Sequence, residues 1–117
     1  MGLDRAGTQS LNELEQLLAF LEVRATGDDP ATVEGPPPAF GEWEYVFGGV
    51  VICQAVAAAT VNAPDGRRLH SMHAYFLRPV ANGAPLTYRV VPVREGRTYS
   101  ARRLEAEQFG KPVLTMT

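Results

Sequence analysis

The sequence predicts an α+β protein in which an antiparallel sheet wraps around one central buried helix. The first observation is the stretch of residues 47–60, where two glycines precede small and branched apolar residues without a charged side chain. A helix that is apolar on every side has to be covered on every side. The second observation is that the rest of the chain, after residue 66, reads as strands separated by short turns. In 117 residues, a curved sheet is the most economical cover for such a helix.

Length and composition limit the possible partners and the compartment. A chain of 117 residues predicts one domain, and a net charge of −2 gives no electrostatic reason to bind nucleic acid or an anionic membrane. The single cysteine, Cys53, excludes a disulfide framework within the chain and suits a reducing compartment. No apolar run resembles a signal peptide or reaches the roughly 20 residues that span a bilayer. We expect a cytoplasmic protein.

Residues 1–30 are predicted to be a tail followed by an amphipathic helix. The S-x-x-E pattern from Ser10 to Glu13 is typical of a capping box. Five leucines then recur at helical spacing and predict a helix over residues 10–22, on the outside of the sheet. They are Leu11, Leu14, Leu17, Leu18 and Leu21.

Residues 31–117 are predicted to form the sheet and its helix. Residues 31–34 suggest a short edge strand, and three consecutive prolines, Pro36 to Pro38, exclude a helix after it. The buried helix is expected over residues 48–61. Four strands follow, the last three as an antiparallel meander with a bulge or edge at Pro92. Their ranges are residues 68–77, 85–93, 98–109 and 113–117. A long helix cradled by such a sheet is the hotdog architecture, so we predict a single hotdog domain.

Four blocks of the sequence resemble the first hotdog repeat of acyl-CoA thioesterase II, the TesB-like family. The most specific is H-S-x-H-x-Y-F-L-R-P, within residues 69–79, and the resemblance covers roughly residues 31–117. The other three blocks are residues 47–55, 94–103 and 110–112. Members of this family are usually double hotdogs in one chain, and they hydrolyse acyl-CoA thioesters. The resemblance therefore implies hydrolysis of acyl-CoA to free fatty acid and CoA. The last strand ends at the terminus without a closing turn, as expected of a fragment or of a domain whose continuation is missing.

The resemblance also implies that the family's catalytic trio is absent from this chain. The catalytic Asp, Thr and Gln of the family belong to its second repeat. Their equivalents here fall near Ser71, near Val93 and at or beyond the chain end. The family commonly has F-G-G-Q at the helix start, whereas this chain has Val50 after the glycines, and Cys53 stands where glycine is common. The following glutamine, Gln54, is retained.

Candidate substrate-binding residues gather in the sequence around the helix start. Thioester hydrolysis needs donors for an oxyanion, and unpaired N–H groups at Gly48 and Gly49 would supply them. Val50 and Gln54 follow on the helix. The alternative is that the two glycines only let the helix enter tightly against the sheet. Arg97 is a candidate for the phosphates of CoA. The alternative for it and for its neighbours Arg102 and Arg103 is a solvated strand face, with Glu105 and Glu107 as partners.

His70 and His73 are the candidate general bases, and structural histidines are the alternative. Being three apart, they would point to opposite faces of a strand and could not share a metal ion, so we expect no metal site. We expect no cofactor either. A nucleophilic role for Ser71 is not expected, because no base and acid accompany it. Trp43 and Tyr45 would line an acyl tunnel or belong to the core.

Two functions remain open from the sequence. The first is an acyl-CoA thioesterase, in which a homodimer or a second hotdog repeat completes the sheet and the site. The second is a non-catalytic module that binds an acyl thioester or only dimerises, which the missing trio favours.

Overall fold

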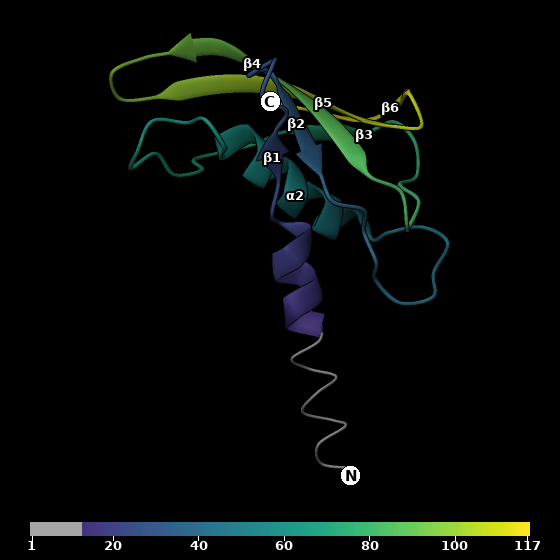
Figure 1. Cartoon of the computed structure of the whole chain (residues 1–117). Helices are drawn as coiled ribbons and strands as arrows, with labels where there is room; N and C mark the ends of the chain where they lie inside the picture. Colours follow the sequence, from purple (N-terminus) through teal and green to yellow (C-terminus); the bar gives the residue numbers. More distant parts are fainter. Residues whose placement is uncertain (1–12) are drawn as a thin grey trace.

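The computed structural model describes residues 13–117 and contains one curved sheet with a helix against its concave side (Figure 1). The six strands are antiparallel and lie in the order β1-β2-β4-β5-β6-β3. This arrangement confirms the predicted architecture. The elements in chain order are β1 Arg24–Ala25, β2 Thr32–Gly35, α2 Gly48–Thr60, β3 Ala74–Phe76, β4 Leu86–Glu95, β5 Ser100–Gln108 and β6 Lys111–Met116.

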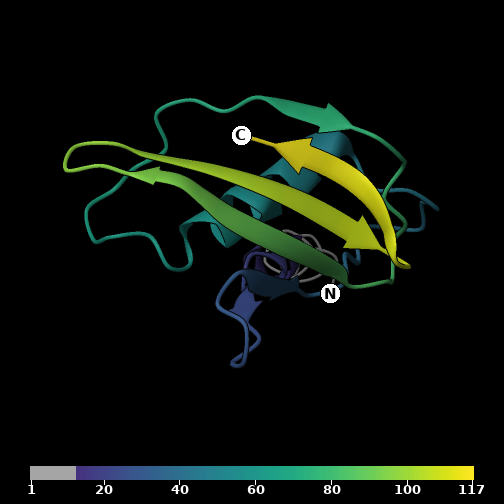
Figure 2. The same cartoon turned by 90° about the horizontal axis from the view of Figure 1, so that it is seen from above.

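The meander of β4, β5 and β6 forms as the sequence predicts. Figure 2 shows these strands as long neighbouring arrows, with β3 at one edge of the sheet. The register between β4 and β5 shifts between Pro92 and Arg94, so Pro92 marks a bulge. The turn into β6 places Phe109 and Gly110 at positive φ, 56° and 73°. Both central residues of a tight type I′ hairpin turn have positive φ, so this turn matches the right-handed twist of its strands.

Two strand predictions are wrong in position. The segment predicted as an edge strand is β2, which lies between β4 and the unpredicted two-residue strand β1. The strand predicted over residues 68–77 is reduced to Ala74–Phe76. His73 still exchanges backbone hydrogen bonds with Thr117, at 2.8 and 2.9 Å. Residues 67–72, which precede His73, lie beyond this last pair and form no strand.

The N-terminal helix is present over residues 13–20, but it does not lie on the outside of the sheet. It projects away from the side of the sheet that carries α2 (Figure 1). Leu14 and Leu18 are about half exposed. Only Phe20, at the end of the helix, enters the core, where its ring meets Phe40 edge-on with centroids 5.1 Å apart. The predicted capping pattern begins at Ser10, outside the described residues.

The sequence predicts that the central helix is covered on all sides. Within this single chain that prediction is wrong, because only one face of the helix is buried. α2 buries Val51, Gln54, Ala55 and Ala58. Cys53, by contrast, is exposed, because the sheet curves around one side of the helix only. An apolar helix face is therefore left without cover in the described chain. Neither helix in residues 13–117 is long and apolar enough to cross a bilayer.

Gln54 is the polar centre of the core. Its side chain is 0% exposed, and Nε2 donates to the carbonyl oxygens of Phe20 at 2.7 Å and Pro36 at 3.0 Å. Oε1 accepts a 2.7 Å hydrogen bond from the Tyr88 hydroxyl, and burial raises the pKa of that hydroxyl. A Cβ atom at Gly35 would lie 2.8 Å from Nε2, so only glycine fits there. The amide thus links α2 to β4 and to the segments on either side of β1 and β2.

We expect Tyr88→Phe to lower the free energy of unfolding by about 1 kcal/mol, the usual contribution of one hydrogen bond. Gln54→Leu should cost more, about 3 kcal/mol, because it leaves two buried carbonyls and a hydroxyl without partners. Urea unfolding measures both losses. The matched control is Tyr99→Phe, whose side chain is largely exposed. Equal stability of Tyr88→Phe and Tyr99→Phe would show that the hydrogen bond between Tyr88 and Gln54 does not stabilise the fold.

Candidate functional site

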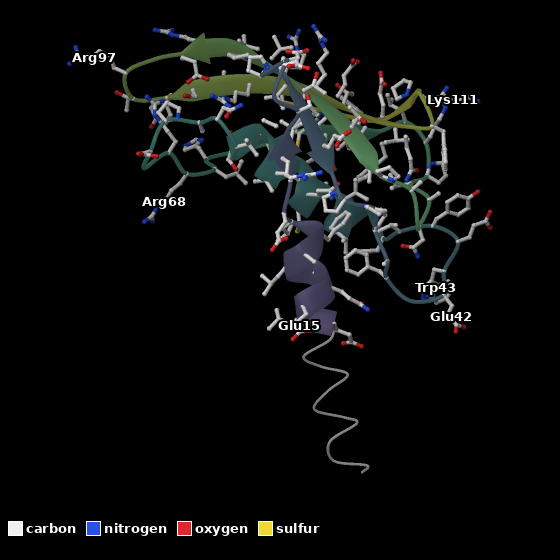
Figure 3. All side chains as sticks on the ribbon, viewed as in Figure 1. Glu15, Glu42, Trp43, Arg68, Arg97 and Lys111 are labelled. Atoms are coloured by element: carbon white, nitrogen blue, oxygen red, sulfur yellow. The ribbon has the colours of Figure 1, made fainter. Side chains whose placement is uncertain are left out.

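A groove of about 780 Å³ lies at the C-terminal end of α2. Its walls are the last turn of α2, the segment that follows it, and the hairpin between β4 and β5. The end of β6 closes the floor. Figure 3 shows Arg68 and Arg97 at this end of the molecule, on the loop and on the hairpin tip.

Both candidate bases, His70 and His73, line this groove. The prediction that they point to opposite faces assumed a regular strand, which residues 70–73 do not form. His70 Nδ1 lies 3.3 Å from Ser71 Oγ, and its ring meets the edge of Tyr99 with centroids 5.6 Å apart. The His73 ring packs on Tyr75, at 4.8 Å. No carboxylate hydrogen-bonds to either histidine within residues 13–117, so neither ring has the acidic partner that orients a catalytic base.

Arg102 fastens the end of α2 to the sheet. Its Nη1 donates to the carbonyl of Ala59 at 2.9 Å, and Nη2 donates to that of Asn62 at 3.2 Å. Terminal carbonyls of a helix have no partner in the helix, and a cation beside them is favourable. The last turn of α2 has no basic residue of its own. The strand β5 therefore supplies the cap that the helix sequence lacks.

Glu95 is the ion-pair partner of Arg102, at 2.8 Å, so the expected partners Glu105 and Glu107 are wrong. Glu105 and Glu107 are exposed, whereas Arg102 on the same strand turns toward the helix end. The Ser100 hydroxyl donates to Glu95 at 2.6 Å, and this bond, together with Arg102, lowers the pKa of the Glu95 carboxyl.

Arg67 extends the same network to the loop after α2. Its Nη1 donates to Ser100 Oγ at 2.9 Å, and its Nη2 donates to the carbonyl of Gly96 at 2.6 Å. The network therefore joins the loop, the hairpin and the helix end, which are the walls of the groove. Sequence reasoning missed Arg67, Ser100 and Glu95 because no spacing along the chain indicates that these segments meet.

Gly48 and Gly49 lie at the opposite end of α2. A Cβ atom at Gly48 would be 3.0 Å from Cζ of Phe76, and one at Gly49 would be 2.9 Å from Cε1 of Phe47. The contact with Phe76 favours the packing alternative at Gly48, whereas the neighbour of Gly49 is the ring of Phe47, which is largely exposed and free to move aside. No side chain of the described residues caps the helix start, and its first turn carries no acid, so it still offers N–H donors to a ligand. Val50 is half-buried against the core.

The structure does not bring the candidate residues into one site. The thirteen residues of α2 separate Gly48 from the groove by roughly 20 Å. Arg97 is exposed at the hairpin tip (Figure 3). The burial of Gln54 favours a structural role for it. Trp43 is 77% exposed and Tyr45 is also exposed, so neither belongs to the core.

Comparison with known sequences places the chain among thioesterase domains. The family model described as Acyl-CoA thioesterase N-terminal domain matches residues 36–117. Acyl-CoA thioesterase 2 of Haemophilus influenzae is 46% identical over 75 residues, covering 64% of this chain and 26% of that protein. Human acyl-coenzyme A thioesterase 8 is 37% identical over 68 residues, covering 58% of this chain and 21% of that protein. The chain thus spans about a quarter of the length of these relatives.

Comparison with solved structures supports the same assignment. The tesB protein of Mycobacterium avium subs. paratuberculosis superposes with a TM-score of 0.76 and 38% identity, covering 88% of this chain and 40% of that one. The Escherichia coli PaaI protein shares the fold over almost the whole of both chains, 99% and 95%, with a TM-score of 0.70 and 17% identity. The chain is therefore a hotdog-fold protein. It belongs to the family of acyl-CoA thioesterase N-terminal domains.

We expect Arg102→Met to lower the free energy of unfolding by about 2 kcal/mol, because it removes charge-assisted bonds to the helix end from a side chain that is only 13% exposed. Arg103→Met is the matched control, since Arg103 is exposed next to it on the same strand. It should change stability by less than about 0.5 kcal/mol. Thermal or urea unfolding measures the difference. Equal losses in the two variants would contradict the capping role.

Proposed function

We propose that this chain is the N-terminal hotdog unit of an acyl-CoA thioesterase, which hydrolyses acyl-CoA to free fatty acid and CoA when a second hotdog unit completes it. The observation that carries the proposal is the family match over residues 36–117, together with 46% identity to a protein named acyl-CoA thioesterase 2. We further propose that residues 31–117 are the hotdog domain, that residues 1–30 are an appended segment, and that the protein is cytoplasmic.

The free edge of the sheet supports pairing with a second unit. His73 and Leu77 direct their backbone N–H groups to β6, at 2.8 Å each. By strand alternation, the N–H groups of Ala74 and Phe76 point away from the sheet. Tyr75 is 62% exposed and Phe76 is about half exposed on this strand. A second unit added at β3 would continue the sheet and lie over the open face of α2.

In such a pair the start of α2 would face a bound thioester. Backbone N–H groups at Gly48 and Gly49 would stabilise the oxyanion that forms when water attacks the thioester carbonyl. Val50 and Arg97 remain proposed substrate contacts. His70 and His73 remain the candidate bases, but within one chain they lie at the other end of α2, so they would act on a thioester that is held at the helix start of the second unit. The family's Asp and Thr positions fall near Ser71 and Val93, which are neither an Asp nor a Thr. This absence favours the second candidate, a non-catalytic module that binds the thioester.

The activity is tested by incubating the purified chain with medium-chain acyl-CoA and a thiol reagent that detects free CoA. We expect release above the uncatalysed rate, lowered at least tenfold by His70→Ala or His73→Ala, whichever removes the base. Release that survives both substitutions excludes both histidines as bases. No release at any acyl chain length supports the binding module instead.

Pairing through β3 is tested with Ala74→Pro, which removes an outward N–H group while β6 keeps its bonds to β3. We expect the native chain to sediment as a dimer and the proline variant to sediment as a monomer. Ala74→Ser is the matched control, because it keeps the N–H group and should dimerise like the native chain. Unchanged dimerisation of Ala74→Pro would show that the contact lies elsewhere.

A further inference from the structure

We infer that the groove at the C-terminal end of α2 binds the phosphorylated nucleotide half of a CoA thioester. The inference rests on the proposed function and adds to it a position for the anionic part of the substrate. Three arginines, Arg67, Arg68 and Arg102, line the groove, and no aspartate or glutamate side chain does. This local excess of positive charge occurs in a chain whose net charge is −2.

The three arginines differ in how much of their charge is available. Arg102 is neutralised by Glu95, at 2.8 Å. Arg67 donates to uncharged oxygens of Ser100 and Gly96 and makes no ion pair within residues 13–117, although Glu95 is near enough to attract it, so Glu95 offsets one of the two charges of Arg67 and Arg102. Arg68 makes no hydrogen bond or ion pair with any described residue and is exposed at the rim. Two positive charges thus remain for an anion, one held in place by its bonds and one free to reach it. Guanidinium groups bind phosphate well.

The shape and lining of the groove also suit a nucleotide. A volume of about 780 Å³ lies within the usual range for small-molecule sites. Met72 and Met116 supply apolar surface, and Tyr99, largely exposed beside His70, offers an aromatic face for a base. Hydroxyl groups of Thr98 and Ser100 stand on the hairpin side. A cationic rim beside an apolar and aromatic wall matches a ligand that carries phosphates on one side and adenine on the other.

The two histidines provide a direct readout, because they are the only ones in the chain and both line the groove. The chain is titrated with CoA, with adenosine 3′,5′-bisphosphate, with pantetheine and with inorganic phosphate, while the imidazole signals are followed by NMR. We expect CoA and the bisphosphate to shift both histidines with similar affinity, and pantetheine to leave them unchanged. Inorganic phosphate should bind at least tenfold more weakly than the bisphosphate.

Substitution of single arginines tests which positive charge binds the bisphosphate. Arg68→Gln should weaken bisphosphate binding about tenfold and leave the unfolding midpoint unchanged, since Arg68 makes no hydrogen bond or ion pair within residues 13–117 that could be lost. Arg103→Gln, which removes the same charge from an exposed position outside the groove lining, should bind like the native chain. Equal weakening by the two substitutions, equal affinity for inorganic phosphate, or histidine shifts with pantetheine would overturn the inference.

The outcome is separable from that of the proposed function. Hydrolysis of acyl-CoA without any bisphosphate-induced histidine shift overturns the nucleotide site alone. Bisphosphate binding without CoA release at any chain length supports the nucleotide site and overturns hydrolysis by this chain.

Discussion

An apolar helix of thirteen residues needs cover on all sides, and the sheet of one chain provides it on one side only. Val51, Ala55 and Ala58 are sealed against the strands, whereas the face that includes Cys53 stays open. The arrangement of the rest of the molecule follows from this constraint. The sheet curves around the helix, and the helix is fixed by contacts other than full burial.

Two polar side chains provide those contacts. Gln54 joins the middle of α2 to Tyr88 on β4, and Arg102 on β5 joins its C-terminal end to the sheet. Because both anchors come from the long strands of the meander, helix and sheet are expected to move as one body. The N-terminal turn of α2 and the groove therefore keep a fixed separation, as the proposed binding of a CoA thioester at both ends would require.

The features that could be predicted from the sequence are those with local signals. The bounds of α2, the three-stranded meander and the bulge at Pro92 follow from apolar runs, turn residues and proline chemistry. The position of β2 inside the sheet could not be predicted, because its outer neighbour β1 has only two residues, which are too few to form a recognisable pattern. The exposed leucines of residues 13–20 show that helical spacing predicts an amphipathic helix without saying what covers it. The groove and its network depend on contacts between distant segments, and His70 and His73 meet there only because the strand is shorter than its sequence suggests.

The contact between Gly35 and the Gln54 amide has an evolutionary consequence. A larger residue at position 35 does not fit beside Gln54, since a methyl group there would occupy the space of the amide. Replacement of Gln54 by a shorter residue would relieve that exclusion and leave the hydroxyl of Tyr88 in need of a new acceptor. Across related sequences, these three positions should therefore co-vary as a group rather than drift one at a time.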